Sequence, residues 1–147
     1  MKSPNPIPPG MHTVTPQLVA RDARQLLAFL ERAFGAEAQH LMPSPEGGIM
    51  HGYVKIGDSV LFLSDASGFS KPTTTNHFLY VHDVDAVFAR GTAAGARALA
   101  PVADMFWGDR WAMLADPWGN VWQVATHKEV LAPEEMMRRM AANAPKG

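Results

Sequence analysis

The sequence contains one pattern of elements twice, about sixty residues apart. A segment at 18–22, Leu-Val-Ala-Arg-Asp, leads into an apolar helical pattern that ends at Gly35. A second segment at 79–83, Leu-Tyr-Val-His-Asp, leads into a helical pattern that ends at Gly95. Short strand-like runs follow each helix, and neither unit is long enough to close a core alone. The repeat predicts two similar halves that share a continuous sheet with a groove for a ligand.

The first half is predicted to be β-α-β-β-β. Its strands are expected at 13–21, where Pro16 favours an edge position, and near 37–42, 48–56 and 59–64. Its helix has Asp22 as N-cap and Gly35 at the left-handed position after its end. One helical face is apolar and carries Leu26, Leu27, Leu30 and Phe34. Gly57 and Asp58 form a hairpin turn.

The second half repeats this order after a linker at 66–75. Strands are predicted at 76–82 and near 97–101, 110–115 and 120–126, with a helix from Val84 that is capped by Asp83 or Asp85. The Asp-Pro-Trp-Gly segment at 116–119 has the composition of a type I turn. Pro133 begins a terminal helix that runs to about Met140.

These elements define the α+β class, because strands follow one another as hairpins after a single helix in each half. We expect a flexible arm over 1–11 and a single domain over 12–127. That domain consists of module one at 12–65, the linker at 66–75 and module two at 76–127. Residues 128–147 form a C-terminal helix and tail.

Composition excludes several classes of function. The chain of 147 residues has a net charge of −1, and its charged residues are scattered. It therefore has no cluster of basic residues that could bind the phosphates of a nucleic acid. No apolar run approaches the roughly 18 residues of a membrane span. Cysteine is absent, which removes thiolate nucleophiles and thiolate metal ligands. We expect a cytoplasmic protein without nucleic-acid or membrane partners.

Several segments in this order resemble the vicinal oxygen chelate superfamily, which holds the glyoxalase I, bleomycin-resistance and fosfomycin-resistance proteins. The resemblance within it is to the PhnB-like, glyoxalase-like subgroup. The segments are TPQLVARD at 15–22, RAFGAE at 32–37, IMH at 49–51, IGDS at 56–59, DVDA at 83–86, AGA at 94–96, MFWGDR at 105–110 and DPWGN at 116–120. The resemblance implies two βαβββ modules in a curved mixed sheet around a cavity, commonly in a homodimer.

The resemblance also implies where a divalent metal would be held. Carried over residue by residue, the four ligand positions are Thr15, Phe62, Asn76 and Gln123, with His77 one step from the third. None of the four supplies an imidazole or a carboxylate, so a dication would exchange water for weak neutral ligands. We therefore expect no metal and no cofactor. This departure argues against the isomerase, transferase and dioxygenase activities of the family.

Two histidines are candidate catalytic groups. His51 shares one face of its strand with Tyr53 and Lys55, where it is either a polar residue facing outward or a base that lines the cavity. His77 is either a core or rim histidine bonded to backbone or a group for proton transfer. No spacing typical of a metal-binding histidine motif strengthens either function.

The segment at 105–111 is the most aromatic in the chain. It is either a loop that closes the cavity, with Phe106 and Trp107 as stacking surfaces and Arg110 as an anchor for an anion, or packing between modules. In the second case Trp107 and Trp111 fill the interface, and Arg110 pairs with Asp109 or Asp116.

Two functions remain. The first is a binding protein that captures an aromatic or amphipathic small molecule, such as an antibiotic or metabolite, without converting it. Its cavity walls would be Thr15, Gln17, Val19, Phe62, Asn76, Phe78, Tyr80, Phe106, Trp107 and Gln123, with Arg110 helping to orient the ligand. The alternative is a glyoxalase-type lyase, isomerase or transferase that uses His51 or His77, or a metal held elsewhere.

Overall fold

The structure, a computed structural model, describes residues 1–144. The chain folds as two compact units, and the boundary along the chain lies between Thr73 and Thr74. The first unit contains β1 (Gln17–Ala20), α1 (Ala23–Phe34), β2 (Glu37–Pro43), β3 (Ile49–Ile56) and β4 (Ser59–Asp65). The second contains β5 (Asn76–Tyr80), α2 (Val84–Ala93), β6 (Arg97–Asp104), β7 (Asp109–Ala115), β8 (Val121–His127) and α3 (Pro133–Ala142).

Each unit has one mixed four-stranded sheet with the same topology. The strand orders are β1-β4-β3-β2 and β5-β8-β7-β6, and in each sheet only the first pair is parallel. The α+β class and the repeat are therefore confirmed. The strands pair within two open sheets, however, and not in the single continuous sheet expected. Each ladder ends on a strand of only four or five residues, and short edge strands limit further pairing.

The helices begin and end where their capping residues predict. Asp22 accepts a hydrogen bond from the Gln25 amide at 3.1 Å, and Gly35 takes a left-handed conformation with φ of 66°. For α2 the cap is Asp83, not Asp85, and it accepts from the Ala86 amide at 3.1 Å. Local chemistry thus fixes the entry of both helices.

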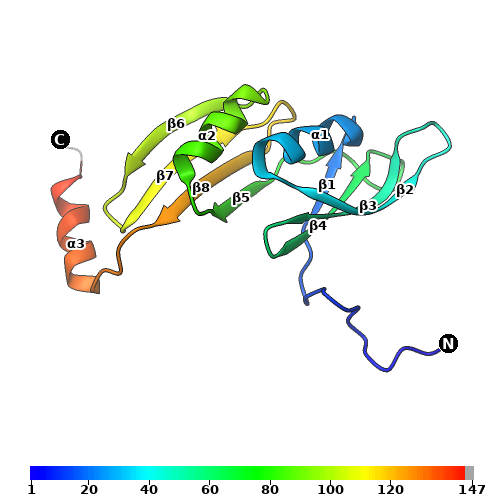
Figure 1. Ribbon diagram of the computed structural model, residues 1–147, viewed down its shortest axis with the longest axis horizontal. Coiled ribbons are helices and arrows are strands. Elements are labelled where there is room, and N and C mark those ends of the chain that lie inside the picture. The colour runs from blue at the N-terminus through cyan, green and yellow to red at the C-terminus, as the bar shows by residue number, and fades with distance from the viewer. Residues whose placement is uncertain (145–147) are drawn as a thin grey trace. The chain divides into compact units, whose positions relative to one another are not determined.

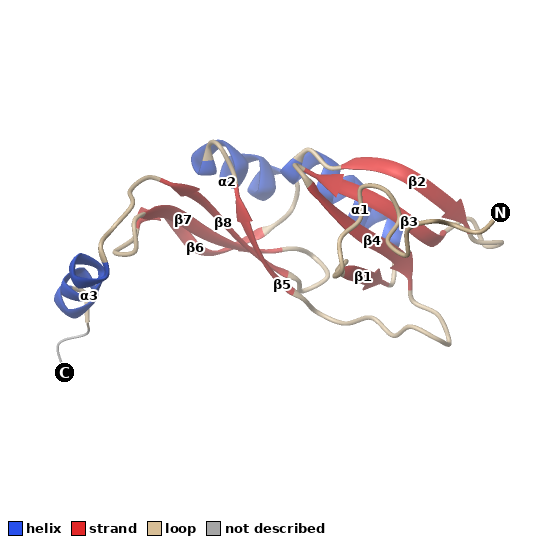
Figure 2. Cartoon of the chain, turned by 90° about the horizontal axis from the view of Figure 1, so that it is seen from below, coloured by secondary structure: helices blue, strands red, loops and turns tan. Residues whose placement is uncertain are grey.

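Each helix covers one face of its own sheet, as the ribbon in Figure 1 and the strands drawn in red in Figure 2 show. In the first unit Leu26 and Leu30 of α1 are fully buried together with Leu63 and Val54 of the sheet. The second core has the same plan and is built from Val84, Val87, Leu114, Trp122 and Val124. On the other face of each sheet the larger side chains, among them Phe62, Phe78 and Tyr80, remain partly exposed.

Strand boundaries differ from the sequence expectation by more than one residue at three places. The fifth strand ends at Tyr80 and not at 82. The first strand begins at Gln17 and not at 13, since Pro16 has no amide proton and only its carbonyl is used, accepting from Phe62 at 2.8 Å. The sixth strand continues to Asp104, past Pro101, because the register with β7 shifts between Ala100 and Ala103 and leaves the proline unpaired.

The C-terminal helix begins at Pro133 as predicted and extends to Ala142. Glu135 in its first turn binds Arg138 and Arg139, and Arg139 also reaches Glu129 at 2.6 Å.

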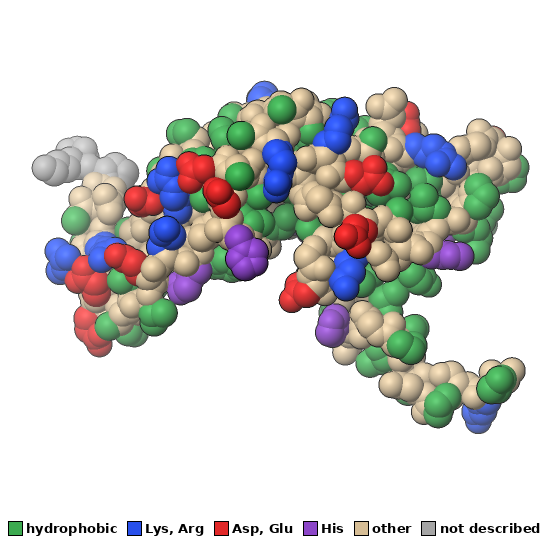
Figure 3. Space-filling view, viewed as in Figure 1, with side chains coloured by type: hydrophobic (Ala, Val, Ile, Leu, Met, Phe, Trp, Pro, Cys, Tyr) green, Lys and Arg blue, Asp and Glu red, His purple; other side chains and the backbone are tan. Residues whose placement is uncertain are grey.

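In residues 1–144 no helix has the length and apolar character that a membrane span needs. Side chains of both charges intermingle on the face shown in Figure 3.

A buried carboxylate holds the predicted turn at 116–119. The Gly119 amide closes the turn on the Asp116 carbonyl at 3.0 Å. The Asp116 side chain, 5% exposed, accepts from the amides of Trp118 and Asn120, from Asn120 Nδ2 and from Trp122 Nε1, each at 2.9 Å. Because a carboxylate can only accept, this site matches four donors to one group.

We predict that Asp116→Ala lowers the free energy of unfolding by about 3 kcal/mol, since four donors lose their shared acceptor. Asp22→Ala is the matched control and should cost about 1 kcal/mol, because it removes one exposed helix cap. Urea denaturation followed by circular dichroism measures both. Equal losses in the two variants would contradict this account.

Candidate functional site

The uncovered face of the first sheet carries polar and aromatic side chains; we call it the first open face, comprising Gln17, Val19, His51, Tyr53, Phe62 and Ser64. The register places Phe62 between Gln17 and Tyr53. The Phe62 ring stacks on Tyr53 at 5.0 Å and contacts His51 edge-on at 4.8 Å. Gln17 Nε2 donates to Ser64 Oγ at 3.3 Å. Thr15 precedes the sheet and is half-buried.

The uncovered face of the second sheet, the second open face, is richer in aromatic side chains. Its residues are Asn76, Phe78 and Tyr80 of β5, Asp109, Trp111 and Met113 of β7, and Gln123 and His127 of β8. Trp111 Nε1 donates to Gln123 Oε1 at 3.1 Å, and Gln123 Nε2 donates to Asn76 Oδ1 at 3.3 Å. These bonds fix the orientation of the two amides beside the rings.

Asp109 is the centre of a hydrogen-bond cluster on the second open face. Its carboxylate, 2% exposed, accepts from the Tyr80 hydroxyl at 3.1 Å and from Trp107 Nε1 at 2.8 Å, and it contacts His127 Nδ1 at 2.8 Å. Partial burial and the bond to Asp109 raise the pKa of the Tyr80 hydroxyl, which keeps it protonated as a donor.

Phe106 and Trp107 belong to the turn between β6 and β7, and their rings pack edge to face at 5.1 Å. Trp107 also contacts Trp111 at 5.9 Å. The aromatic segment therefore borders the second open face through the ring contacts of Trp107. Sequence analysis missed Asp109 and His127 as functional residues. No local pattern relates them, because they meet only where the start of β7 pairs with the end of β8.

Arg110 does not take part in the second open face. Its guanidinium bonds Asp85 of α2 at 2.7 Å and Asp104 at 3.1 Å, so it lies on the helix side of the sheet. The expected pair of Arg110 with Asp109 or Asp116 is therefore wrong, because Asp85 and Asp104 are its partners. The hydrogen bond from Arg110 holds the pKa of the Asp85 carboxyl below its usual range.

The two candidate histidines lie in different environments. His51 is half-buried on the first open face against Tyr53 and Phe62. His77 points to the helix side of its sheet, where its ring stacks on buried Trp122 at 4.6 Å. Its Nε2 is buried without a hydrogen-bond partner among the described residues. His77 is therefore a half-buried residue on the helix side of the sheet, which separates it from Phe78 and Tyr80.

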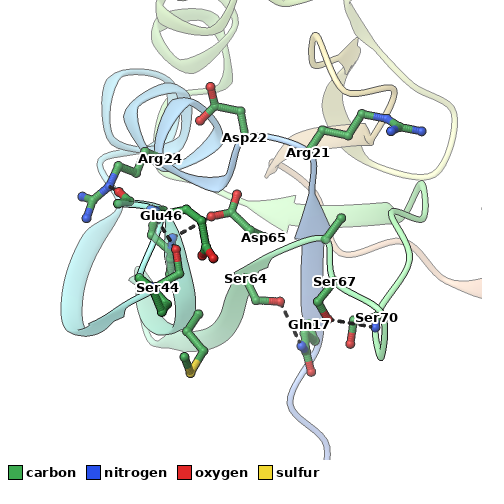
Figure 4. Close-up of a pocket in the computed structure, with 16 residues that line it drawn as sticks. Gln17, Arg21, Asp22, Arg24, Ser44, Glu46, Ser64, Asp65, Ser67 and Ser70 are labelled. Atoms are coloured by element: carbon green, nitrogen blue, oxygen red, sulfur yellow. Dashed lines mark hydrogen bonds between the residues drawn. The ribbon is translucent and has the colours of Figure 1, made fainter.

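A hollow of about 770 Å³ lies at the end of the first sheet, beside the start of α1 (Figure 4). Asp65 accepts from the Ala23 amide at 2.8 Å and from the Ile49 amide at 2.6 Å. Arg24 Nε donates to the Gly47 carbonyl at 2.7 Å. These polar groups join the loop after β2 to the helix start, so their role is structural. Of the predicted wall residues, the hollow includes only Gln17.

Comparison with known proteins places this architecture in a family. The profile of the Glyoxalase/Bleomycin resistance protein/Dioxygenase superfamily matches residues 10–124. The chain belongs to this superfamily. The superfamily resemblance drawn from the sequence is thereby confirmed.

Two known proteins illustrate what this chain is similar to. An uncharacterized protein of Mycobacterium tuberculosis is 31% identical over 141 residues, which cover 88% of this chain and 82% of the relative. TioX from Micromonospora sp. ML1 is 27% identical with a TM-score of 0.68, over 80% of this chain and 99% of TioX.

A third relative shares only the fold. The fosfomycin resistance protein FosX from Listeria monocytogenes, crystallised as a mutant with Mn(II) and 1S,2S-dihydroxypropylphosphonic acid, is 15% identical with a TM-score of 0.61. The match covers 88% of this chain and 99% of FosX.

The metal positions implied by the glyoxalase family do not fit a dication in this chain. Gln123 Oε1 and Asn76 Oδ1 already accept from Trp111 and Gln123, and the Phe62 ring stacks on Tyr53. Thr15 adds one neutral hydroxyl. Hard dications favour carboxylate or several oxygen ligands, and imidazole suits the transition metals. Within residues 1–144 no three His, Cys, Asp or Glu side chains gather as a metal site.

We predict that His77 makes stability depend on pH. Burial lowers its pKa, although Asp116 acts in the opposite direction, so below the ordinary value of 6.5 the unfolded chain binds more protons than the folded one. The free energy of unfolding should therefore fall as the pH drops from about 7.5 to about 5.5.

His77→Phe keeps the ring stacked on Trp122 without a titratable group, and it should flatten this dependence. His12→Phe, at an exposed residue, is the control and should preserve it. Urea denaturation at the two pH values gives the comparison. The same slope in His77→Phe and wild type would refute the assignment.

Proposed function

We propose that this protein binds a small aromatic molecule, with its main contacts on the second open face and without a catalytic metal. The observation that supports this most directly is the exposure of aromatic rings beside fixed amides. The side chains of Phe78 and Tyr80 are 43% and 65% exposed, and their rings lie 5.1 Å apart. Exposed aromatic clusters of this kind are typical of recognition surfaces.

The polar groups of this face suit orientation of a ligand more than chemistry. Gln123 and Asn76 are held in place by hydrogen bonds to neighbours of the same face, and each amide oxygen keeps a second lone pair. A few fixed polar groups among apolar walls are the usual composition of small-molecule sites. Phe62 and Tyr53 offer a similar stacked surface on the first open face.

Family membership supports the same class of function. The superfamily includes bleomycin resistance proteins, and FosX is a fosfomycin resistance protein, so an antibiotic is one class of ligand to test. We further propose membership of the PhnB-like subgroup, on the segments at 105–110 and 116–120, together with a cytoplasmic location and a homodimer. Exposed Met137 and Met140 of α3 are adaptable contacts for a second copy.

We predict that Phe78→Ser weakens the binding of 4-nitroanisole, a neutral aromatic probe, by about five- to tenfold, since one ring contact is lost. Phe69→Ser is the matched control: Phe69 is fully exposed, belongs to neither open face and should leave affinity unchanged. Equilibrium dialysis measures both. Equal affinities for wild type and Phe78→Ser would remove the second open face as the binding surface.

A second prediction concerns metals. Protein purified without a chelating tag should contain far less than one equivalent of Mn, Zn or Ni, and added Mn(II) should not raise the melting temperature. Elemental analysis and thermal unfolding provide the measurements. One tightly held equivalent that disappears in Gln123→Ala would instead favour the metal-dependent enzyme.

A further inference from the structure

The Asp109 cluster holds an imidazole that the proposed binding of aromatic rings does not use. His127 is the last residue of β8 and pairs across the sheet with Asp109, the first residue of β7. Its side chain is 54% exposed, whereas that of Asp109 is 2% exposed. A buried carboxylate thus positions a ring that remains open to solvent and to a ligand.

The hydrogen bonds define which nitrogen of His127 is available. The indole of Trp107 can only donate, and the Tyr80 hydroxyl also donates to the same carboxylate oxygen, as expected for an ionised Asp109. An ionised carboxylate can only accept, so His127 Nδ1 carries the proton in its 2.8 Å contact. In the neutral ring Nε2 is then the nitrogen that carries the lone pair.

We propose that His127 Nε2 is a proton-accepting subsite for the acidic hydroxyl of an aromatic ligand, with Asp109 as its positioning residue. This proposal rests on the proposed function and names the ligand class, a phenol. Tyr80 and Trp107 share the carboxylate with His127, so aromatic surface borders the imidazole. A phenol ring can stack there while its hydroxyl faces Nε2.

The proton transfer balances without another reactant. The phenol O–H bond breaks, its electron pair stays on oxygen, and the proton forms an N–H bond at Nε2. The product is a phenolate bound to an imidazolium, and the imidazolium is stabilised by the Asp109 carboxylate through Nδ1–H. Charge-assisted hydrogen bonds of this kind are shorter and stronger than neutral ones.

The probe for this subsite is 4-nitrophenol, whose phenolate absorbs at longer wavelength than the neutral form. At a pH where the free probe is mostly neutral, the bound probe should show the phenolate band. His127→Phe should abolish the band and weaken binding about tenfold or more, because a hydrogen bond to a charged group is lost. His82→Phe, at an exposed histidine outside the cluster, should behave as wild type.

A second variant, His127→Gln, distinguishes loss of the proton acceptor from loss of the fold. His127→Gln can keep a hydrogen bond to Asp109 but accepts no proton, so it should bind the probe in its neutral form. 4-Nitroanisole, which has no acidic proton, should bind wild type and His127→Gln alike. A phenolate band that survives in His127→Phe or His127→Gln would overturn the subsite alone. Failure of both probes to bind wild type would overturn the proposed function and the subsite with it.

Discussion

One helix covers only one face of a four-stranded sheet, and this limit governs both halves of the protein. Leu63 and Val54 lie beneath α1, whereas their neighbours Phe62 and Tyr53 point to the other side. In the second half Trp122 is buried under the helix, whereas its neighbour Gln123 points to the other side. Since strand side chains alternate, the neighbours of each buried core position point to the face that the helix does not cover. The open faces, and with them the candidate site, follow from this geometry.

Buried carboxylates then set the local structure in different ways. Asp116 accepts hydrogen bonds from four donors inside the second unit. Each of its two carboxylate oxygens accepts two of them, which leaves neither oxygen for a ligand. Asp65 joins the start of α1 to the start of β3. Asp109 differs because two of its three partners, Tyr80 and His127, are exposed. The same chemistry therefore serves folding in two cases and can serve recognition in the third.

Much of the fold could be predicted from local patterns. The cap at Asp22, the turn at 116–119 and the start of α3 at Pro133 depend on neighbouring residues alone. The cavity walls expected from the sequence include Asn76, Phe78 and Tyr80, and the structure places these three on one face. Arg110 could not be placed in this way, because its partner Asp85 is far along the chain and is brought near only when α2 packs on the sheet.

The sequence by itself determined the repeat, the element order and the absence of charged ligands at the metal positions of the glyoxalase family, because these depend on residue type and spacing. Only the tertiary structure decided that the strands form two sheets, that the His77 ring stacks on Trp122 and that His127 contacts the Asp109 carboxylate. Each of these depends on cross-strand register and on which strand pairs with which, and register joins residues that no local pattern relates.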